Sequence, residues 1–237
     1  MDKLIVVIPA LNEALTLRNL VASLLADYPE ISVLVVDDAS EDDTATEALS
    51  AGAGLLSLSV RLGPWGATQA GVRRACDLGF EYALSMDADG QHLPGTITQL
   101  IEAMNESDAD IVIGSAPCRG SALRNLAWKM MRVVSGLEIT DLTSGFRLYN
   151  KRAMNLVANE RASYLQYQDI GVLALVLEHK MRVVEAAVEM APRQQGVSRI
   201  FNSWLAVVVY MLHTLLLGLS KRSRYRSAMN ALHGDAQ

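Results

Sequence analysis

The sequence has little of what marks several common protein classes. It contains only two cysteines, Cys76 and Cys118, in 237 residues. Neither a disulfide framework nor a four-cysteine zinc site can be built from them. Basic residues do not outnumber acidic ones, and the net charge of −5 argues against a nucleic-acid partner. We therefore expect a reduced compartment, with the cytoplasm as the default.

Familiar phosphate-binding motifs are also missing. No G-x-x-x-x-G-K-[ST] loop occurs, and the single G-x-G, at residues 52–54, lacks the third glycine of the dinucleotide fingerprint. P-loop NTPases and Rossmann-type dinucleotide enzymes are therefore disfavoured. The N-terminal apolar run at 4–8 is too short for a signal peptide, and the polar residues Asn12 and Glu13 soon follow it. We interpret that run as a buried strand.

What the sequence does contain is a regular alternation of short apolar runs and helical patterns. Hydrophobic residues make up 51 % of the chain, which is enough for a sizeable core. The pattern predicts strands at 4–8, 32–36, 55–60, 82–86 and 111–113, with helices at 14–26, 42–51, 66–78 and 95–104. This order predicts an α/β fold with a mostly parallel sheet and helices on both faces. The second half is less regular, with helices expected at 121–135 and 169–179, a polar loop at 141–147 and a strand at 181–188.

Polar residues follow three of the predicted strands. Residues 9–13 follow the first, Asp37 and Asp38 the second, and Asp87 and Asp89 the fourth. Ligands bind beyond the carboxyl ends of strands in such sheets, so we expect these residues to converge there. Capping of the next helix is the alternative for Asp37 and Asp38.

Asp87 and Asp89 are separated by a single residue. Two carboxylates this close repel each other unless a cation or a proton lies between them. Together with the side-chain carbonyl of Gln91, they form an oxygen donor set suited to Mg²⁺ or Mn²⁺. An EF-hand calcium loop is rejected because Gly90 comes too early and Thr98 replaces the terminal glutamate. The predicted use of the pair is a metal-bridged diphosphate.

Five ordered motifs resemble those of the family 2 glycosyltransferases, above all the dolichyl- and polyprenyl-phosphate sugar synthases. They are VIPALNE at 7–13, VVDDASEDDT at 35–44, MDADGQH at 86–92, DLTSGFR at 141–147 and R-x-x-G-x-S-R at 193–199. The resemblance implies a GT-A catalytic domain over residues 1–200. It also implies inverting, metal-dependent transfer of a sugar from a nucleotide diphosphate sugar (UDP- or GDP-linked) to a polyprenyl phosphate or a glycan, as in cell-envelope polysaccharide or glycolipid synthesis.

The same resemblance implies roles for individual residues. Those around the nucleotide sugar are Pro9, Leu11, Glu13, Asp37, Asp38, Asp87, Ala88 and Arg193. Those holding the metal are Asp87, Asp89 and Gln91. Those near the acceptor or its phosphate are Arg147, Arg193, Ser198 and Arg199, and the catalytic candidates are Asp89, Arg147 and Asp169. Surface ion pairs are the alternative for the arginines, and a helix cap is the alternative to a general base for Asp169.

Two stretches depart from the family pattern. Residues 61–66 read RLGPWG where Asn-x-Gly-Lys-Gly is usual, and Ala116 stands where an arginine often follows the fifth strand. The altered stretch at 61–66 keeps open a non-catalytic scaffold with the same fold, and a nucleotidyltransferase acting on sugar phosphates stays open because it too binds nucleotides on an α/β sheet with metal-binding carboxylates. The nucleotidyltransferase usually carries an early glycine-rich basic loop, which residues 9–13 do not provide.

The C-terminal segment, residues 201–237, has a separate character. Residues 201–220 contain no charged side chain, and a basic cluster follows at 221–226. A wide apolar face with one polar stripe favours an amphipathic helix in a membrane interface. A homo-oligomer contact, packing against the domain and a membrane span are the alternatives. We expect peripheral contact with the inner face of the cytoplasmic membrane, or an oligomer, through residues 201–226.

Overall fold

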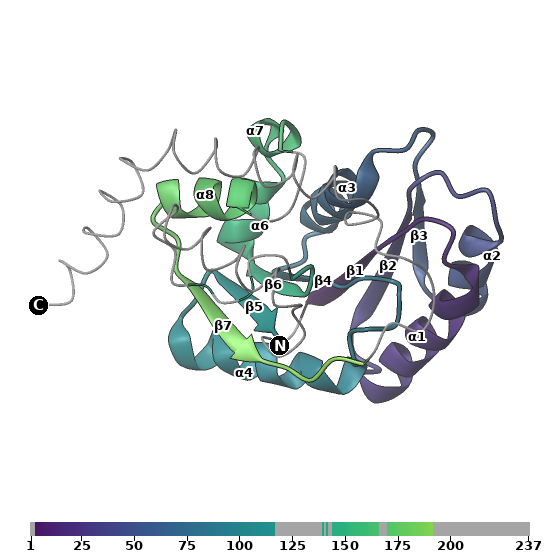
Figure 1. Ribbon diagram of the computed structural model, residues 1–237, viewed down its shortest axis with the longest axis horizontal. Coiled ribbons are helices and arrows are strands. Elements are labelled where there is room, and N and C mark those ends of the chain that lie inside the picture. Colours follow the sequence, from purple (N-terminus) through teal and green to yellow (C-terminus); the bar gives the residue numbers. More distant parts are fainter. Residues whose placement is uncertain (1–2, 117–138, 140, 142–143, 166–169, 192–237) are drawn as a thin grey trace, which may run out of the picture.

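The structure, a computed structural model, describes residues 3–116, 139, 141, 144–165 and 170–191. Its elements in chain order are β1 (Leu4–Ala10), α1 (Ala14–Asp27), β2 (Ser32–Asp37), α2 (Thr44–Ser50), β3 (Gly54–Ser57), α3 (Gly63–Asp77), β4 (Tyr82–Ser85), the 3₁₀ turn η1 (Pro94–Thr96), α4 (Ile97–Ser107), β5 (Ile111–Ser115), β6 (Arg147–Asn150), α6 (Lys151–Val157), α7 (Glu160–Ser163), α8 (Ile170–Glu178) and β7 (Val183–Ala187). The strands form one seven-stranded sheet in the order β3-β2-β1-β4-β6-β5-β7. Figure 1 shows α3, α6 and α8 on one side of this sheet and α1 and α4 on the other.

The predicted α/β architecture with a mostly parallel sheet is confirmed. Every neighbouring pair of strands runs parallel except the two pairs that include β6. The predicted C-terminal boundary of the polar loop at 141–147 is wrong, because Arg147 already belongs to β6. This four-residue strand begins with a charged residue and lies between β4 and β5, so its partners specify it more than its own pattern does.

The central strands are apolar on both faces because helices cover both faces. In β1, Ile5 and Val7 pack into the cluster that contains residues of α3, α6 and α8. The alternate residues Val6 and Ile8 pack into the cluster that contains residues of α1 and α4. The two faces follow the period-two geometry of a strand, and the continuous hydrophobic run is typical of a doubly covered parallel sheet.

Gly71 lets α3 lie close to the sheet. A methyl group at this position would stand 2.3 Å from Val7 Cγ1 and 2.9 Å from Val36 Cγ2. Both neighbours belong to the buried core. The missing side chain therefore sets the distance between the helix and the strands that carry the acidic loops.

Several predicted boundaries differ from the structure. The strand predicted at 55–60 ends at Ser57, because its partner β2 ends at Asp37, which pairs with Ser57. The helix predicted at 66–78 begins earlier, at Gly63. The helix expected at 121–135 and the amphipathic helix expected within 201–226 lie outside the described residues. Among the helices that the structure describes, none has the length and hydropathy needed to cross a membrane.

Candidate active site

The carboxyl ends of β2, β1 and β4 lie side by side at one edge of the sheet. Asp37 ends β2 and is in register with Ala10, which ends β1, while Ser85 at the end of β4 is in register with Val7. Since these strands are parallel, the loops that follow them leave the sheet on the same side. The structure thus brings together the polar residues 9–13, 37–38 and 87–91.

The loops after β1 and β2 are tied to each other by hydrogen bonds. The Asn12 backbone N–H donates to Ser40 Oγ at 3.0 Å, and the Glu41 N–H donates to Asn12 Oδ1 at 2.9 Å. The Glu13 N–H donates to Thr44 Oγ1 at 2.9 Å. Asn12 also adopts the left-handed backbone region, with φ of 53°, which asparagine tolerates better than most residues. The two loops therefore behave as one braced unit.

Four residues expected near the nucleotide sugar belong to this unit or adjoin it. Pro9 lies inside β1 in register with Val36, and Leu11 and Glu13 are half-buried in the loop that follows. Asp37 is buried, and its Oδ1 accepts a hydrogen bond from the Ser40 N–H at 3.1 Å. This contact closes the turn after β2, as a short acidic side chain does in an Asx turn.

Asp38 holds the N-terminus of α3. Its carboxylate accepts hydrogen bonds from the Leu62 N–H at 2.6 Å and the Gly63 N–H at 2.9 Å, one on each oxygen. The residue is only 3 % exposed. A carboxylate is well placed at a helix N-terminus, where free N–H groups and the helix dipole favour negative charge. Asp38 therefore fixes the path of the loop between β3 and α3.

The stretch at 61–66, which departs from the family pattern, has a structural explanation. Gly63 adopts a φ of 80°, which favours glycine, and Pro64 occupies the first turn of α3. Trp65 is buried, and its Nε1 donates to the Ala162 carbonyl at 2.8 Å. The substituted residues thus begin α3 and fasten it to α7.

Asp42 strengthens the same braced unit. It accepts hydrogen bonds from the Thr44 N–H at 3.0 Å, from the Thr44 hydroxyl, and from the Ala14 N–H at 3.2 Å. Partial burial by itself raises the pKa of this carboxyl, but the hydrogen bonds outweigh burial and lower the pKa below its ordinary value. The ionised form of Asp42 is the one that links the start of α1 to the start of α2.

The loop between β4 and η1 carries the predicted metal ligands. Asp89 Oδ1 accepts a hydrogen bond from the Gln91 N–H at 3.1 Å, and Gly90 between them has φ of 72°. Ala88 is buried, and its carbonyl accepts from the Thr16 hydroxyl of α1 at 2.8 Å. The Asp87 side chain is 49 % exposed. The backbone of the loop is therefore anchored while a carboxylate faces solvent.

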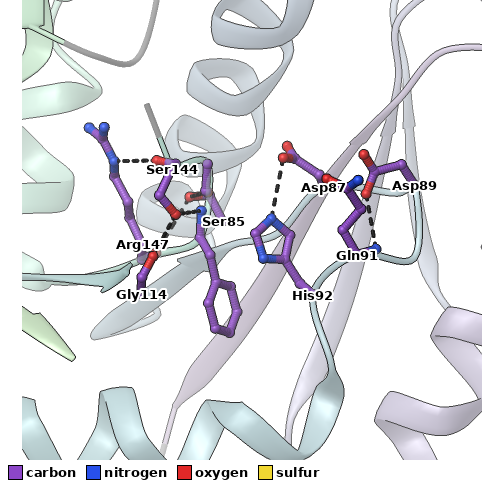
Figure 2. A network of polar contacts seen from close by, with 10 residues as sticks. Ser85, Asp87, Asp89, Gln91, His92, Gly114, Ser144 and Arg147 are labelled. Atoms are coloured by element: carbon purple, nitrogen blue, oxygen red, sulfur yellow. Dashed lines mark hydrogen bonds and ion pairs between the residues drawn. The ribbon is translucent and has the colours of Figure 1, made fainter. Parts of the chain in front are cut away.

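His92 lies directly against Asp87. Its Nε2 is 3.3 Å from Asp87 Oδ2, and its side chain is only 2 % exposed. The imidazole stacks on the Phe146 ring, with centroids 4.8 Å apart and planes at 23°. Figure 2 shows the His92 ring aimed at the Asp87 carboxylate, with Asp89 and Gln91 farther along the loop.

Gly145 contacts Asp87 from the segment 144–147. A methyl group on Gly145 would stand 2.8 Å from Asp87 Oδ1 and 2.9 Å from Oδ2. No side chain fits between this backbone and the carboxylate in the observed arrangement. The backbone at Gly145 therefore passes close to the carboxylate of the predicted metal ligand, and the missing side chain leaves room for it.

Arg147 and two serines hold that segment in place. Arg147 Nε donates to the Ser144 carbonyl at 2.9 Å, and the residue is 0 % exposed. Ser144 Oγ donates to the Gly114 carbonyl at 2.7 Å, and Ser85 Oγ donates to the Gly145 carbonyl at 2.6 Å. Figure 2 shows these groups beside the Asp87–His92 pair. The alternative of a surface ion pair is wrong for Arg147, because the residue is fully buried.

The chain after β7 returns to the loop that follows β4. Met190 forms an antiparallel bridge with His92, and the Ala191 N–H donates to the Gln91 carbonyl at 2.9 Å. Arg193 follows two residues later in the sequence. The predicted site residues Asp169, Arg193, Ser198 and Arg199 lie outside the described residues.

The donor set after β4 fits a hard divalent cation. Two carboxylates and an amide carbonyl are oxygen ligands of the kind that Mg²⁺ and Mn²⁺ prefer. Among the described residues, no group of three or more His, Cys, Asp and Glu is placed to hold a metal by itself. Such a site suits an ion that takes its remaining ligands from phosphate oxygens and water.

Two parts of the site were not predicted from the sequence. His92 and Gly145 lie within the motifs at 86–92 and 141–147, and the motifs predicted no role for either of them, although both lie beside Asp87. The sequence did contain a signal for His92, because a histidine five residues after the predicted ligand Asp87 is a candidate hydrogen-bond partner for its carboxylate. The bracing by Asn12 was missed because its partners lie in a loop nearly thirty residues away.

Comparison with known proteins identifies relatives for most of the chain. The family described as "Glycosyl transferase family 2" matches residues 5–160. The undecaprenyl-phosphate mannosyltransferase of Micrococcus luteus is 33% identical over 215 residues, covering 83% of this chain and 87% of the relative. The polyprenol monophosphomannose synthase of Mycolicibacterium smegmatis is 28% identical over 221 residues, covering 85% and 82%.

Solved structures share the fold. Glucosyl-3-phosphoglycerate synthase from Mycobacterium tuberculosis, in complex with Mn²⁺, uridine diphosphate and phosphoglyceric acid, superposes with a TM-score of 0.67 at 19% sequence identity. The match covers 93% of this chain and 78% of that one. At this identity the likeness speaks for the fold alone, and it agrees with the sheet described above.

Proposed function

This chain belongs to glycosyl transferase family 2, and we propose that it transfers a sugar from a nucleotide diphosphate sugar to a polyprenyl phosphate with the help of Mg²⁺ or Mn²⁺. Family membership makes it a glycosyltransferase, which disfavours both a sugar-phosphate nucleotidyltransferase and a non-catalytic scaffold. The names of both relatives given above combine mannose with a polyprenyl carrier: an undecaprenyl-phosphate mannosyltransferase and a polyprenol monophosphomannose synthase. A mannosyl donor is therefore the first to test.

The observation that carries the proposal is the position of Asp87 and Asp89. They follow β4 directly, beside the braced loops of β1 and β2, and the Asp87 side chain is 49 % exposed. Asp87, Asp89 and Gln91 would hold the cation. The nucleoside would lie along residues 9–13 and Asp37, with Asp38 acting through the α3 loop that it fixes.

The chemistry follows from charge. When bound, the cation supplies a positive charge on the diphosphate, which becomes more negative as the bond between sugar and phosphate breaks. The residues of this chain add orientation: Gly145 and His92 confine the Asp87 carboxylate, and the hydrogen bond of Gln91 to Asp89 fixes the second ligand. Arg147 and Arg193 are proposed to add guanidinium charge near the phosphates.

The acceptor determines whether a base is needed. An ionised polyprenyl phosphate attacks without losing a proton, so Asp169 has no necessary role as a base with that acceptor. A hydroxyl group on a glycan would need one. With a lipid acceptor, reaction takes place at a membrane surface, and residues 201–226 are the proposed peripheral contact or oligomer contact.

The test is sugar transfer by the full chain with GDP-mannose, and then with other GDP- and UDP-sugars, to a polyprenyl phosphate in the presence of Mn²⁺. We expect metal-dependent turnover that Asp89→Ala lowers at least about 100-fold, since the ligand acts on transition-state charge. Asp77→Ala is the matched control, because Asp77 is an exposed aspartate at the end of α3.

Other outcomes would contradict specific parts of the proposal. Turnover that persists in Asp89→Ala with unchanged metal dependence would remove Asp89 from the metal site. Transfer to a glycan but not to any polyprenyl phosphate would show that the proposed acceptor is wrong. Turnover of the wild type that is unchanged by a metal chelator would show that the reaction needs no divalent cation.

A further inference from the structure

His92 is a polar residue at a buried position, where an apolar side chain would cost less free energy to bury. Its side chain is 2 % exposed and lies flat against Phe146. Burying a polar ring costs free energy unless its nitrogen atoms find partners. One nitrogen has such a partner, the Asp87 carboxylate, at 3.3 Å.

The two ring nitrogens differ in their surroundings. Among the described residues, nothing accepts from or donates to the buried Nδ1. A proton on Nδ1 would place an unpaired N–H in the interior, which costs more than a bare lone pair. The favoured tautomer therefore carries its proton on Nε2, where it is donated to Asp87 Oδ2.

We infer that His92 is a positioning residue for the Asp87 carboxylate, holding its Oδ2 by a hydrogen bond and so fixing the orientation in which the carboxylate would bind the cation. The inference rests on the proposed function, since it concerns the metal ligand of that site. Ligating carboxylates are commonly oriented by an outer hydrogen-bond donor, and the loss of that donor weakens metal binding.

The rest of the surroundings fits this role. The backbone at Gly145 passes close to both carboxylate oxygens and leaves no room for a side chain beside them, and Phe146 next to it stacks on the imidazole. The backbone of His92 is held as well, through its bridge to Met190. Asp87 is thus confined between Gly145 and the His92 ring, with about half of its side chain open to solvent.

The experiment measures Mn²⁺ affinity directly, by electron paramagnetic resonance of the full chain with and without the nucleoside diphosphate of the accepted donor. His92→Phe keeps a stacking ring but removes the donor, and His92→Gln keeps a donor near the position of Nε2 but removes the ring. We expect His92→Phe to weaken Mn²⁺ binding by about 10- to 100-fold. His92→Gln should stay within about 3-fold of the wild type, by the same reasoning on the retained donor.

A second readout separates positioning from general stability. Saturating Mn²⁺ should restore most of the kcat of His92→Phe, while the thermal midpoint stays close to that of the wild type. Should His92→Phe fail to fold, His92→Gln and His92→Met form the replacement pair, and Gln should bind Mn²⁺ about 10-fold more tightly.

The failures can be told apart. Equal Mn²⁺ affinity in wild type and His92→Phe, with binding abolished in Asp89→Ala, would overturn the inference and leave the proposed function intact. Absence of Mn²⁺ binding by the wild type, with or without nucleotide, would overturn both. Equal affinities of the Gln and Met variants would also overturn the role of the donor.

Discussion

Asp38 and Asp87 occupy similar positions in the chain and have different surroundings. Each follows a parallel strand of the same sheet, β2 for Asp38 and β4 for Asp87. Asp38 is 3 % exposed, and both of its oxygens accept backbone N–H groups of the α3 loop. Asp87 has a side chain that is 49 % exposed, with a histidine on one oxygen.

The difference separates two uses of one residue type. A buried carboxylate whose oxygens are engaged by backbone groups stabilises a loop and has little capacity left for a ligand. A half-exposed carboxylate on an anchored loop stays accessible to a cation from solvent. The strand-end position predicts that an acid matters, whereas burial and partners decide whether it serves the fold or the chemistry.

The largest expected effect comes from removing Asp38. Asp38→Ala leaves the Leu62 and Gly63 N–H groups without their acceptor, and we expect the free energy of unfolding to fall by about 2–4 kcal/mol, because hydrogen bonds to a charged group are strong. Asp87→Ala removes a half-exposed side chain and should cost less than about 1 kcal/mol. Urea unfolding of both variants measures the difference.

Activity sharpens that comparison. Asp38→Ala, assayed below its unfolding transition, should keep more of its kcat than Asp87→Ala does. If instead Asp38→Ala unfolds like the wild type and loses nucleotide binding, Asp38 is a nucleoside ligand and both aspartates serve the chemistry. Asp77→Ala again serves as the exposed acidic control.

Two glycines provide a second, smaller contrast. Alanine at Gly71 would drive a methyl group to 2.3 Å from Val7 Cγ1 in the packed core, and we expect a loss of about 1–3 kcal/mol with little change in KM for Mn²⁺. Alanine at Gly145 would meet the end of a movable side chain, the Asp87 carboxylate, at 2.8 Å. We expect Gly145→Ala to cost little stability but to raise the KM for Mn²⁺ about 10-fold, by displacing a ligand.

Melting temperatures and Mn²⁺ titrations of the two variants check this prediction. The contrast breaks if Gly145→Ala destabilises the protein as much as Gly71→Ala does. That result would mean that the 144–147 segment supports the fold and does not tolerate a shift of Asp87.

The sequence predicted the first half of the sheet well, because periodicity and strand-end acids report directly on a parallel βαβ arrangement. The four strands up to Tyr82–Ser85 lie where expected, apart from the shortened Gly54–Ser57. It did not predict β6, since Arg147–Asn150 has no apolar period and is specified by its neighbours. The contacts of Asp87 with His92 and Gly145 depend on packing between distant segments, which local patterns do not encode.

The smallest expected effect is a pH dependence on the braced side of the site. The pKa of Asp42 lies below its ordinary value because hydrogen bonds from Thr44 and Ala14 outweigh the opposing effect of partial burial. A group with a depressed pKa in the folded state contributes stability above its unfolded pKa and loses it as pH falls through the folded pKa. Asp42→Asn should therefore destabilise the protein at pH 7, and the difference should shrink as the pH falls through the lowered pKa of the wild-type carboxyl. Urea midpoints of the two proteins at pH 7 and at successively lower pH test this, and a gap that stays the same at low pH would show that Asp42 acts through its shape and not its charge.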